Sequence, residues 1–197
     1  MRIEIINTDL CPIWKISQAA GTSHGKCDAS SKRAETCFKL GHMSVFEFAN
    51  FTARIEGISR ACAHQLVRHR MASYVELSQR YTKVDTSGND WYVLPPEIAE
   101  SKYDASVFRE AMEDAAFTYK DLLLYGYKPE DARYILPQAT KTAITMQMNV
   151  RELFAFLDLR QDKAAQWEIR ELANELEKEL RAMSDEWETL LDWKKDV

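Results

Sequence analysis

An apolar stripe near the C-terminus constrains the fold of this chain more than any other feature of its sequence. Its members recur at steps of three and four residues, the spacing that lines up one face of an α-helix. The pattern predicts one long helix over about 164–191, whose apolar face is either core or a surface that joins subunits. Trp187 and Trp193 favour a partly exposed face that binds a partner. The stripe comprises Ala165, Ile169, Leu172, Leu176, Leu180, Met183, Trp187 and Leu190.

The other periodic segments place this helix in a mixed α/β chain. Strands are predicted where apolar residues alternate or β-forming residues cluster, at 2–6, 46–57, 91–96 and 142–149. Helices are predicted at 11–20, 30–40, 58–70, 97–125, 129–136 and 150–160. Because 197 residues suffice for one core, we expect a single α+β domain over 1–197, with a small, mainly antiparallel sheet flanked by long helices.

Charge and composition disfavour several classes of protein. The net charge of −5 argues against a general nucleic-acid binder, which carries a basic excess. No apolar run approaches the roughly 20 residues of a membrane helix, and the first residues lack the apolar centre of a signal peptide, so we expect a cytoplasmic protein without membrane contact.

The four cysteines form no CxxC pair and are expected to be reduced, mostly buried thiols. The spacing of His24, Cys27, Cys37 and His42 is compatible with zinc, but the helix predicted around Cys37 favours thiols without metal.

Arginines gather in the segment RHRMASYVELSQRY, which runs from Arg68 to Tyr81. The segment contains no lysine and interleaves Arg68, Arg70 and Arg80 with hydroxyl groups and with the carboxylate of Glu76. Guanidinium groups bind phosphate oxygens through paired hydrogen bonds. The segment therefore suits an anionic ligand with hydroxyl groups or a heterocycle, namely a nucleotide.

Other motifs that would define a reaction are missing from the sequence. It contains no GxxxxGK[ST] or GxGxxG phosphate loop, no HExxH and no GxSxG turn. Cys62 and His64 are two residues apart, which turns them away from each other on a helix and favours a buried thiol. Arg133, Arg151 and Arg160 are either core ion pairs or anion ligands. From the residues alone, the chain is a nucleotide-binding α/β enzyme or module without an obvious nucleophile.

Five ordered segments resemble the flavin-dependent thymidylate synthases. The family signature RHR-x7-S runs here from Arg68 to Ser78; GHMSVFEF and IEGISRACAHQLVRHR lead into it, and DARYILP and NVRELFAFLDLRQDKAAQWEIR follow. The resemblance covers about Ala19 to Ala173. It implies that the chain makes dTMP from dUMP, with methylenetetrahydrofolate as carbon donor and FAD, reduced by NADPH, as hydride carrier. It also implies that no enzyme cysteine acts as nucleophile, and that the chain forms a homotetramer with active sites at subunit interfaces.

The resemblance also assigns roles position by position. Arg160 matches the catalytic arginine that polarises the uracil ring and stabilises negative charge on it. The flavin-binding positions match His42, Ser44, Arg68, His69, Arg70, Glu76, Asn149, Arg151 and Ala155. The dUMP-binding positions match Gln65, Arg68, Glu76, Leu77, Ser78, Gln79, Arg80, Arg133 and Arg160. No metal site is implied.

Several positions depart from the family pattern, mostly on the flavin side. Ala164 stands where many relatives have a histidine that contacts flavin, and Ala155 stands where many have asparagine. The other departures are Gly21, Thr22, Phe48 and Val75. We therefore expect nucleotide binding to be retained and flavin binding to be weaker. Two alternatives stay open: a related flavoenzyme that alkylates a different pyrimidine nucleotide, and an inactive relative that binds nucleotides or nucleic acid.

Overall fold

The computed structural model describes residues 1–26, 28 and 30–195. Within those residues it contains a sheet of four strands. Val150 N–H donates to Ala49 O near one end of the central pair, and Arg60 N–H donates to Thr140 O near the other, so these strands run antiparallel. The predicted α+β class with a small, mainly antiparallel sheet is confirmed. The strand order is β1 (Arg2–Thr8), β2 (Asn50–Ser59), β4 (Lys141–Asn149) and β3 (Ala72–Glu76).

The chain divides into two compact units. The first comprises Met1–Ile55, Leu66–Val75 and Thr145–Val197, and the second comprises Glu56–Gln65 and Glu76–Ile144. Strands β2, β3 and β4 each contribute residues to both units. The single domain over 1–197 stays a prediction.

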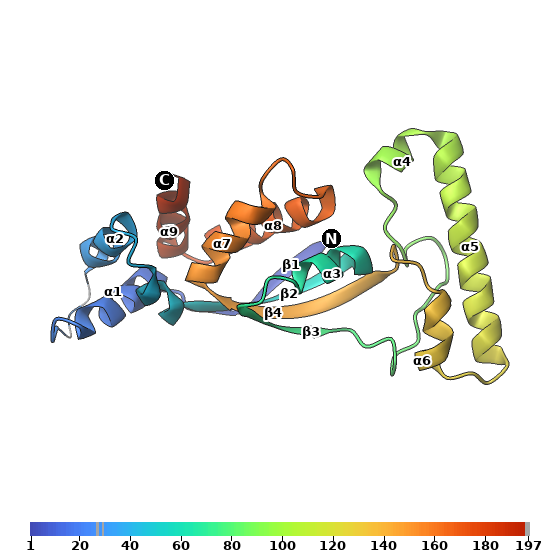
Figure 1. The fold of residues 1–197 in the computed structure, drawn as a ribbon, viewed down its shortest axis with the longest axis horizontal. Helices are drawn as coiled ribbons and strands as arrows, with labels where there is room; N and C mark the ends of the chain where they lie inside the picture. Colours follow the sequence, from blue (N-terminus) through green and yellow to red (C-terminus); the bar gives the residue numbers. More distant parts are fainter. Residues whose placement is uncertain (27, 29, 196–197) are drawn as a thin grey trace. The chain divides into compact units, whose positions relative to one another are not determined.

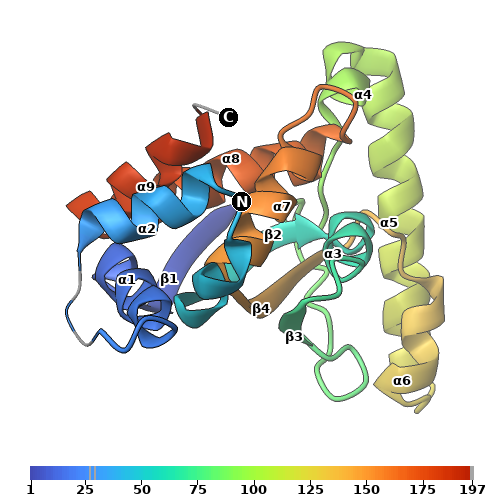
Figure 2. The same ribbon diagram turned by 60° about the vertical axis from the view of Figure 1, so that its left-hand side comes forward.

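Helices from both ends of the chain build the first unit around its strands. Figures 1 and 2 show α7 and α8 lying over these strands, and α8 packs on β1. The predicted helix 150–160 is confirmed as α7, which begins where Asn149 Oδ1 accepts the Glu152 N–H at 2.9 Å. The helices of this unit are α1 (Pro12–Thr22), α2 (Ser31–Lys39), the 3-10 helix η1 (Met43–Phe48), α7 (Val150–Arg160), α8 (Trp167–Arg181) and α9 (Asp185–Lys195).

The predicted single helix over 164–191 is wrong, because the chain breaks between α8 and α9. Ser184 accepts the Trp187 N–H at 3.3 Å and donates to Leu10 O at 2.7 Å, so it caps α9 and ties it to the start of the chain. The expectation of a partly exposed face at Trp187 is also wrong. This side chain is fully buried, and its Nε1 donates to Asp9 O at 2.8 Å. Most of the stripe is core within one chain, although Ala165, Met183 and the nearby Trp193 are only half-buried.

Two predicted boundaries in the region 46–60 are corrected as well. Residues 46–48 belong to η1, and β2 begins only at Asn50. Ile58 lies at the end of β2, because the helix that follows, α3 (Arg60–Leu66), starts after Ser59. Ser59 Oγ accepts the Cys62 N–H at 3.0 Å, which is the expected position of an N-cap side chain.

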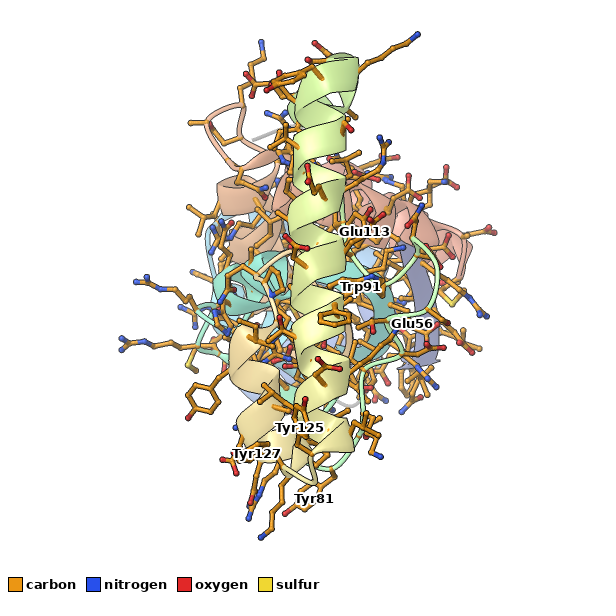
Figure 3. The ribbon with its side chains drawn as sticks, turned by 90° about the vertical axis from the view of Figure 1, so that its right-hand side faces the viewer. Glu56, Tyr81, Trp91, Glu113, Tyr125 and Tyr127 are labelled. Atoms are coloured by element: carbon orange, nitrogen blue, oxygen red, sulfur yellow. The ribbon has the colours of Figure 1, made fainter. Side chains whose placement is uncertain are left out.

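The second unit is built around its longest helix, α5. Its core packs Trp91 and Tyr92 against Met112 and Ala116 of α5, and Figure 3 shows Trp91 beside the middle of this helix. The predicted helix 97–125 is wrong as one element, because Ser101 interrupts it and caps α5 by accepting the Asp104 N–H at 3.2 Å. The predicted strand 91–96 is reduced to a bridge between Tyr92 and Thr140. Besides most of α3, the unit contains α4 (Pro96–Glu100), α5 (Lys102–Leu124), α6 (Pro129–Ala132) and the 3-10 helix η2 (Arg133–Ile135).

One exposed face of α5 carries three large apolar side chains beside charged ones such as Glu110, which lies on the same side of the helix. Tyr103, Phe117 and Leu124 stand at multiples of seven residues, so they lie on one side of the helix, and their exposed fractions are 77%, 67% and 81%. Tyr125 and Tyr127, both exposed, lie at the C-terminal end of this helix (Figure 3). This face has no partner within the described part of the chain.

The remaining expectations concern membranes, metals and thiols. None of the helices that the structure describes is long and apolar enough to cross a membrane. Cys27 lies outside the described residues, and the residues that are described contain no cluster of three or more potential metal ligands. Of the other cysteines only Cys62 is buried, whereas Cys37 is half-buried and Cys11 exposed, so the expectation of mostly buried thiols is wrong for these positions.

Candidate active site

The predicted site residues divide between the two units. His42, Ser44, Arg68, His69, Arg70, Asn149, Arg151, Ala155 and Arg160 belong to the first unit. Gln65, Glu76, Leu77, Ser78, Gln79, Arg80 and Arg133 belong to the second. The flavin set therefore falls mainly in the first unit, and the nucleotide set mainly in the second.

His69 lies at the centre of a polar cluster in the first unit. Its Nε2 is 3.3 Å from Glu152 Oε2, and its ring packs edge-on against Phe156 with the centroids 5.6 Å apart. The Tyr74 hydroxyl donates to the backbone oxygen of His69 at 3.0 Å. Nε2 has no well-aligned hydrogen-bond partner among the described residues. The imidazole is thus fixed in position, with Nε2 buried and facing the Glu152 carboxylate.

The charge of Arg160, the last residue of α7, acts on this cluster. Burial lowers the pKa of His69 below its ordinary value of 6.5, Glu152 opposes this effect, and Arg160 adds to it. Burial also raises the pKa of Tyr74 to about 12, against the opposing charge of Arg160. At neutral pH both His69 and Tyr74 are therefore uncharged. Asp158, two residues before Arg160 on α7, pairs with Lys194 at 2.6 Å.

Four predicted flavin ligands of the first unit are exposed. Arg68 and Arg70 lie in the loop between α3 and β3, and neither forms an ion pair with a described residue. His42 and Ser44 lie at the start of η1. Two guanidinium groups without carboxylate partners provide a donor set suited to phosphate oxygens.

The predicted flavin ligands at the start of α7 make contacts within the protein. Arg151 is paired with Glu47 of η1, and Asn149 uses its Oδ1 to cap the helix. Ala155 is exposed on α7. Because an exposed ion pair contributes only about 0–1 kcal/mol, a phosphate can replace Glu47 as the partner of Arg151 at little cost.

A polar cavity of about 350 Å³ lies in the second unit. The structure brings two predicted dUMP ligands together in its lining, Gln79 and Arg133. Gln79 is buried, and its Nε2 has no hydrogen-bond partner among the residues described. Such a group favours a ligand that brings an acceptor, because an unpaired buried donor costs about 1–3 kcal/mol. The polar lining consists of Arg60, His64, Gln79, Arg133, Tyr134 and Gln138.

Glu76, at the end of β3, forms an ion pair with Arg60, an arginine that was not among the predicted site residues. Its Oε1 is 3.1 Å from Arg60 Nη1 and accepts a hydrogen bond of 3.0 Å from Thr142 Oγ1. Arg60 and His64 both line the cavity, and both were missed as site residues. A signal was present, since residues four apart on α3 share one face of the helix.

The remaining predicted nucleotide ligands follow β3 or lie on α3. Arg80 Nε is 2.6 Å from Glu130 Oε2, and its hydrogen bond lowers the pKa of that carboxyl. Ser78 Oγ accepts the Arg80 N–H at 3.3 Å, and Leu77 N–H donates to Ala143 O at 2.8 Å. Gln65 is half-buried on α3.

Two departures from the family pattern that are distant in sequence line one cavity of the first unit. Thr22 and Phe48 border a space of about 890 Å³ together with Lys26. Gly21, beside them, has no room for a side chain, because an added Cβ would lie 2.6 Å from Lys26 O and 2.8 Å from Arg33 Nη1. The departures Val75, Ala155 and Ala164 are exposed.

Comparison with known proteins places these residues in a family context. The profile of the family described as "Thymidylate synthase complementing protein" matches residues 9–184. A flavin-dependent thymidylate synthase of Pyrococcus furiosus is 38% identical over 207 residues, covering 99% of this chain and 84% of that protein. Proteins of the same name from Pyrococcus abyssi and Geobacter sulfurreducens are 43% and 49% identical, covering 79% and 70% of this chain. The chain spans 64% and 59% of the lengths of these two relatives.

Proposed function

The chain belongs to the flavin-dependent thymidylate synthase family, and on this premise we propose that it converts dUMP to dTMP. Methylenetetrahydrofolate would supply the carbon, and FAD reduced by NADPH would supply the hydride. The observation that carries the proposal is the cavity of the second unit, where two guanidinium groups and the unpaired amide of Gln79 line one space.

The chemistry of this cavity suits a nucleoside monophosphate. Arg60 and Arg133 supply positive charge, and none of the described residues that line the cavity is acidic. Gln79 Nε2 needs an acceptor, which a phosphate oxygen or a pyrimidine carbonyl provides. Ser78 and Arg80 follow on the same stretch of chain and complete the set of proposed dUMP contacts.

The donor set of the first unit fits FAD. The cofactor carries a diphosphate, and the exposed guanidinium groups of Arg68 and Arg70 suit its oxygens. His69 lies between these two arginines in the sequence, and its imidazole is neutral at pH 7. When bound, FAD supplies the hydride for the reduction. By the resemblance the same ligand is also held by His42, Ser44, Glu76, Asn149, Arg151 and Ala155.

We assign catalysis to Arg160. Its role is to hold a fixed positive charge against the negative charge that develops on the uracil ring, which lowers the cost of activating the ring without a thiolate. The surroundings support this role. His69 and Tyr74 are both uncharged at neutral pH, so neither cancels nor competes with the charge of Arg160.

The proposed assembly is a homotetramer with active sites at subunit interfaces. The C-terminal stripe is buried within the chain, so it does not supply the contact surface. The exposed face of α5 around Tyr103, Phe117 and Leu124 supports an alternative place for subunit contact, because a second chain would cover these apolar side chains. A cytoplasmic location stays a prediction.

The test is release of the C5 hydrogen of dUMP by the purified protein, together with formation of dTMP. FAD, NADPH and methylenetetrahydrofolate are each omitted in turn. Release and dTMP formation that need all three support the proposal. No dTMP from a folded protein that binds flavin would contradict it, and hydrogen release from dCMP instead would identify a related enzyme for a different pyrimidine nucleotide.

A further inference from the structure

Arg60, at the start of α3, is not among the nucleotide ligands that the family resemblance assigns, although it lines the cavity and adds positive charge to it. We propose that Arg60 binds the phosphate of the nucleotide and that Glu76 is the positioning residue that holds its guanidinium group. The inference rests on the proposed function, because it takes dUMP as the ligand of the cavity.

The contacts of Arg60 fix one side of its guanidinium group. Nη1 is buried and forms an ion pair with Glu76 Oε1 at 3.1 Å, without a well-aligned hydrogen bond, and the Thr142 hydroxyl donates to the same oxygen at 3.0 Å. The side chain as a whole is still 21% exposed, so its exposed surface belongs to atoms other than Nη1. Because Arg60 lines the cavity, the N–H groups that Glu76 does not use are available to a ligand there.

The position of Arg60 suits a phosphate better than the other parts of a nucleotide. Uracil and deoxyribose are neutral, whereas the phosphate is a dianion that one guanidinium group does not neutralise. Arg133 brings the second guanidinium group to the same cavity, and Gln79 adds a neutral donor. An arginine already held by Glu76 loses less side-chain freedom when it binds, which favours affinity.

This arrangement gives Glu76 a role that differs from direct contact with the nucleotide. Its Oε1 is used by Arg60 and Thr142. If Glu76 acts through Arg60, its substitution has no further effect once Arg60 is gone. If Glu76 contacts the nucleotide directly, the two substitutions weaken binding independently.

The experiment measures binding of dUMP and of deoxyuridine, which lacks the phosphate, to the purified, flavin-saturated protein by calorimetry. The variants are Arg60→Met, Arg60→Lys, Glu76→Gln and the double variant Arg60→Met/Glu76→Gln. Arg109→Met is the control, because Arg109 is an exposed arginine of α5 in the same unit. Circular dichroism and thermal unfolding establish that each variant is folded.

Arg60→Met is expected to weaken dUMP binding by about tenfold to a hundredfold, the range for a hydrogen bond to a charged group, while deoxyuridine binding changes by less than about twofold. Arg60→Lys is expected to lie between wild type and Arg60→Met, since lysine keeps the charge but loses the planar fork. Glu76→Gln is expected to cause a smaller loss, and the double variant to bind no more weakly than Arg60→Met.

Three results would overturn the proposal while leaving the proposed function in place. Unchanged dUMP affinity in Arg60→Met would remove Arg60 from the site, and an equal loss for dUMP and deoxyuridine would make its role structural. A double variant weaker than Arg60→Met would show that Glu76 does not act through Arg60. If Arg60→Met does not fold, the affinities of Arg60→Lys and Glu76→Gln for dUMP and deoxyuridine are compared with wild type in the same way. Failure of the wild-type protein to bind dUMP would reject the proposed function, and this inference with it.

Discussion

Replacing Trp187 with phenylalanine tests whether the C-terminal stripe is core within one chain. The indole is fully buried, donates to Asp9 O at 2.8 Å and meets Phe51 edge-on with the ring centroids 6.2 Å apart. Phenylalanine keeps an aromatic ring but removes the N–H donor. The unpaired carbonyl of Asp9 costs about 1–3 kcal/mol, and the smaller ring leaves a void worth about 1 kcal/mol. The expected loss in the free energy of unfolding is therefore roughly 2–4 kcal/mol.

Urea unfolding of the variant and the wild-type protein measures this loss, with Trp14→Phe as the matched control. Trp14 is 50% exposed, so its replacement is expected to change stability by less than about 0.5 kcal/mol. The difference between Trp187→Phe and wild type should be the same at two protein concentrations, because the contacts lie within one chain. Equal losses at Trp187 and Trp14, or a loss that vanishes at high protein concentration, would refute the assignment of the stripe to the core.

Three further predictions concern the polar residues of the site. Arg160→Ala is expected to reduce the rate of dTMP formation by about a hundredfold or more in a folded protein, while Arg109→Ala leaves it unchanged; similar rates in both would contradict the catalytic assignment. His69 has a folded pKa below 6.5, so the unfolded chain binds more protons there, and stability should fall as pH drops below about 6.5. Urea titrations between about pH 8 and pH 5 should show a smaller loss of stability for His69→Gln than for the wild-type protein. An identical loss would exclude His69 as its cause. Glu130→Gln removes the carboxylate that pairs with Arg80 and should tighten dUMP binding by about twofold to fivefold, whereas weaker binding would mean that Glu130 assists the ligand.

The elements that sequence predicted best carry their own boundary signals. α7 begins at the Asn149 cap and ends at Arg160, and the pattern predicted the same bounds. The break between α8 and α9 was missed because the apolar stripe stays in phase across it. Ser184 carries a local capping signal, but its bond to Leu10 O joins residues 174 positions apart. Such a contact exists only in the folded chain, so periodicity could not reveal it.

The site shows the same division between local and distant information. The expectation of a nucleotide and a flavin as ligands came from the arginine-rich segment and from the family resemblance. Their protein partners did not. Arg151 pairs with Glu47, which is 104 residues away, and Arg80 pairs with Glu130, which is 50 residues away. The role of Arg60 depends on the approach of α3 to the end of β3, which no spacing within either segment specifies.

These pairs bear on how a chain with a net charge of −5 can bind two anionic ligands. Unpaired arginines in one site repel each other, and a nearby carboxylate relieves that repulsion before a ligand arrives. The pair of Arg80 with Glu130 is exposed and therefore weak, so a phosphate can displace the carboxylate. The pair of Arg60 with Glu76 is mostly buried and shares a hydrogen bond with Thr142, so it is better suited to stay intact while phosphate binds. We therefore expect added salt to alter the contribution of Arg80 to dUMP affinity more than that of Arg60, because screening acts chiefly on exposed charges.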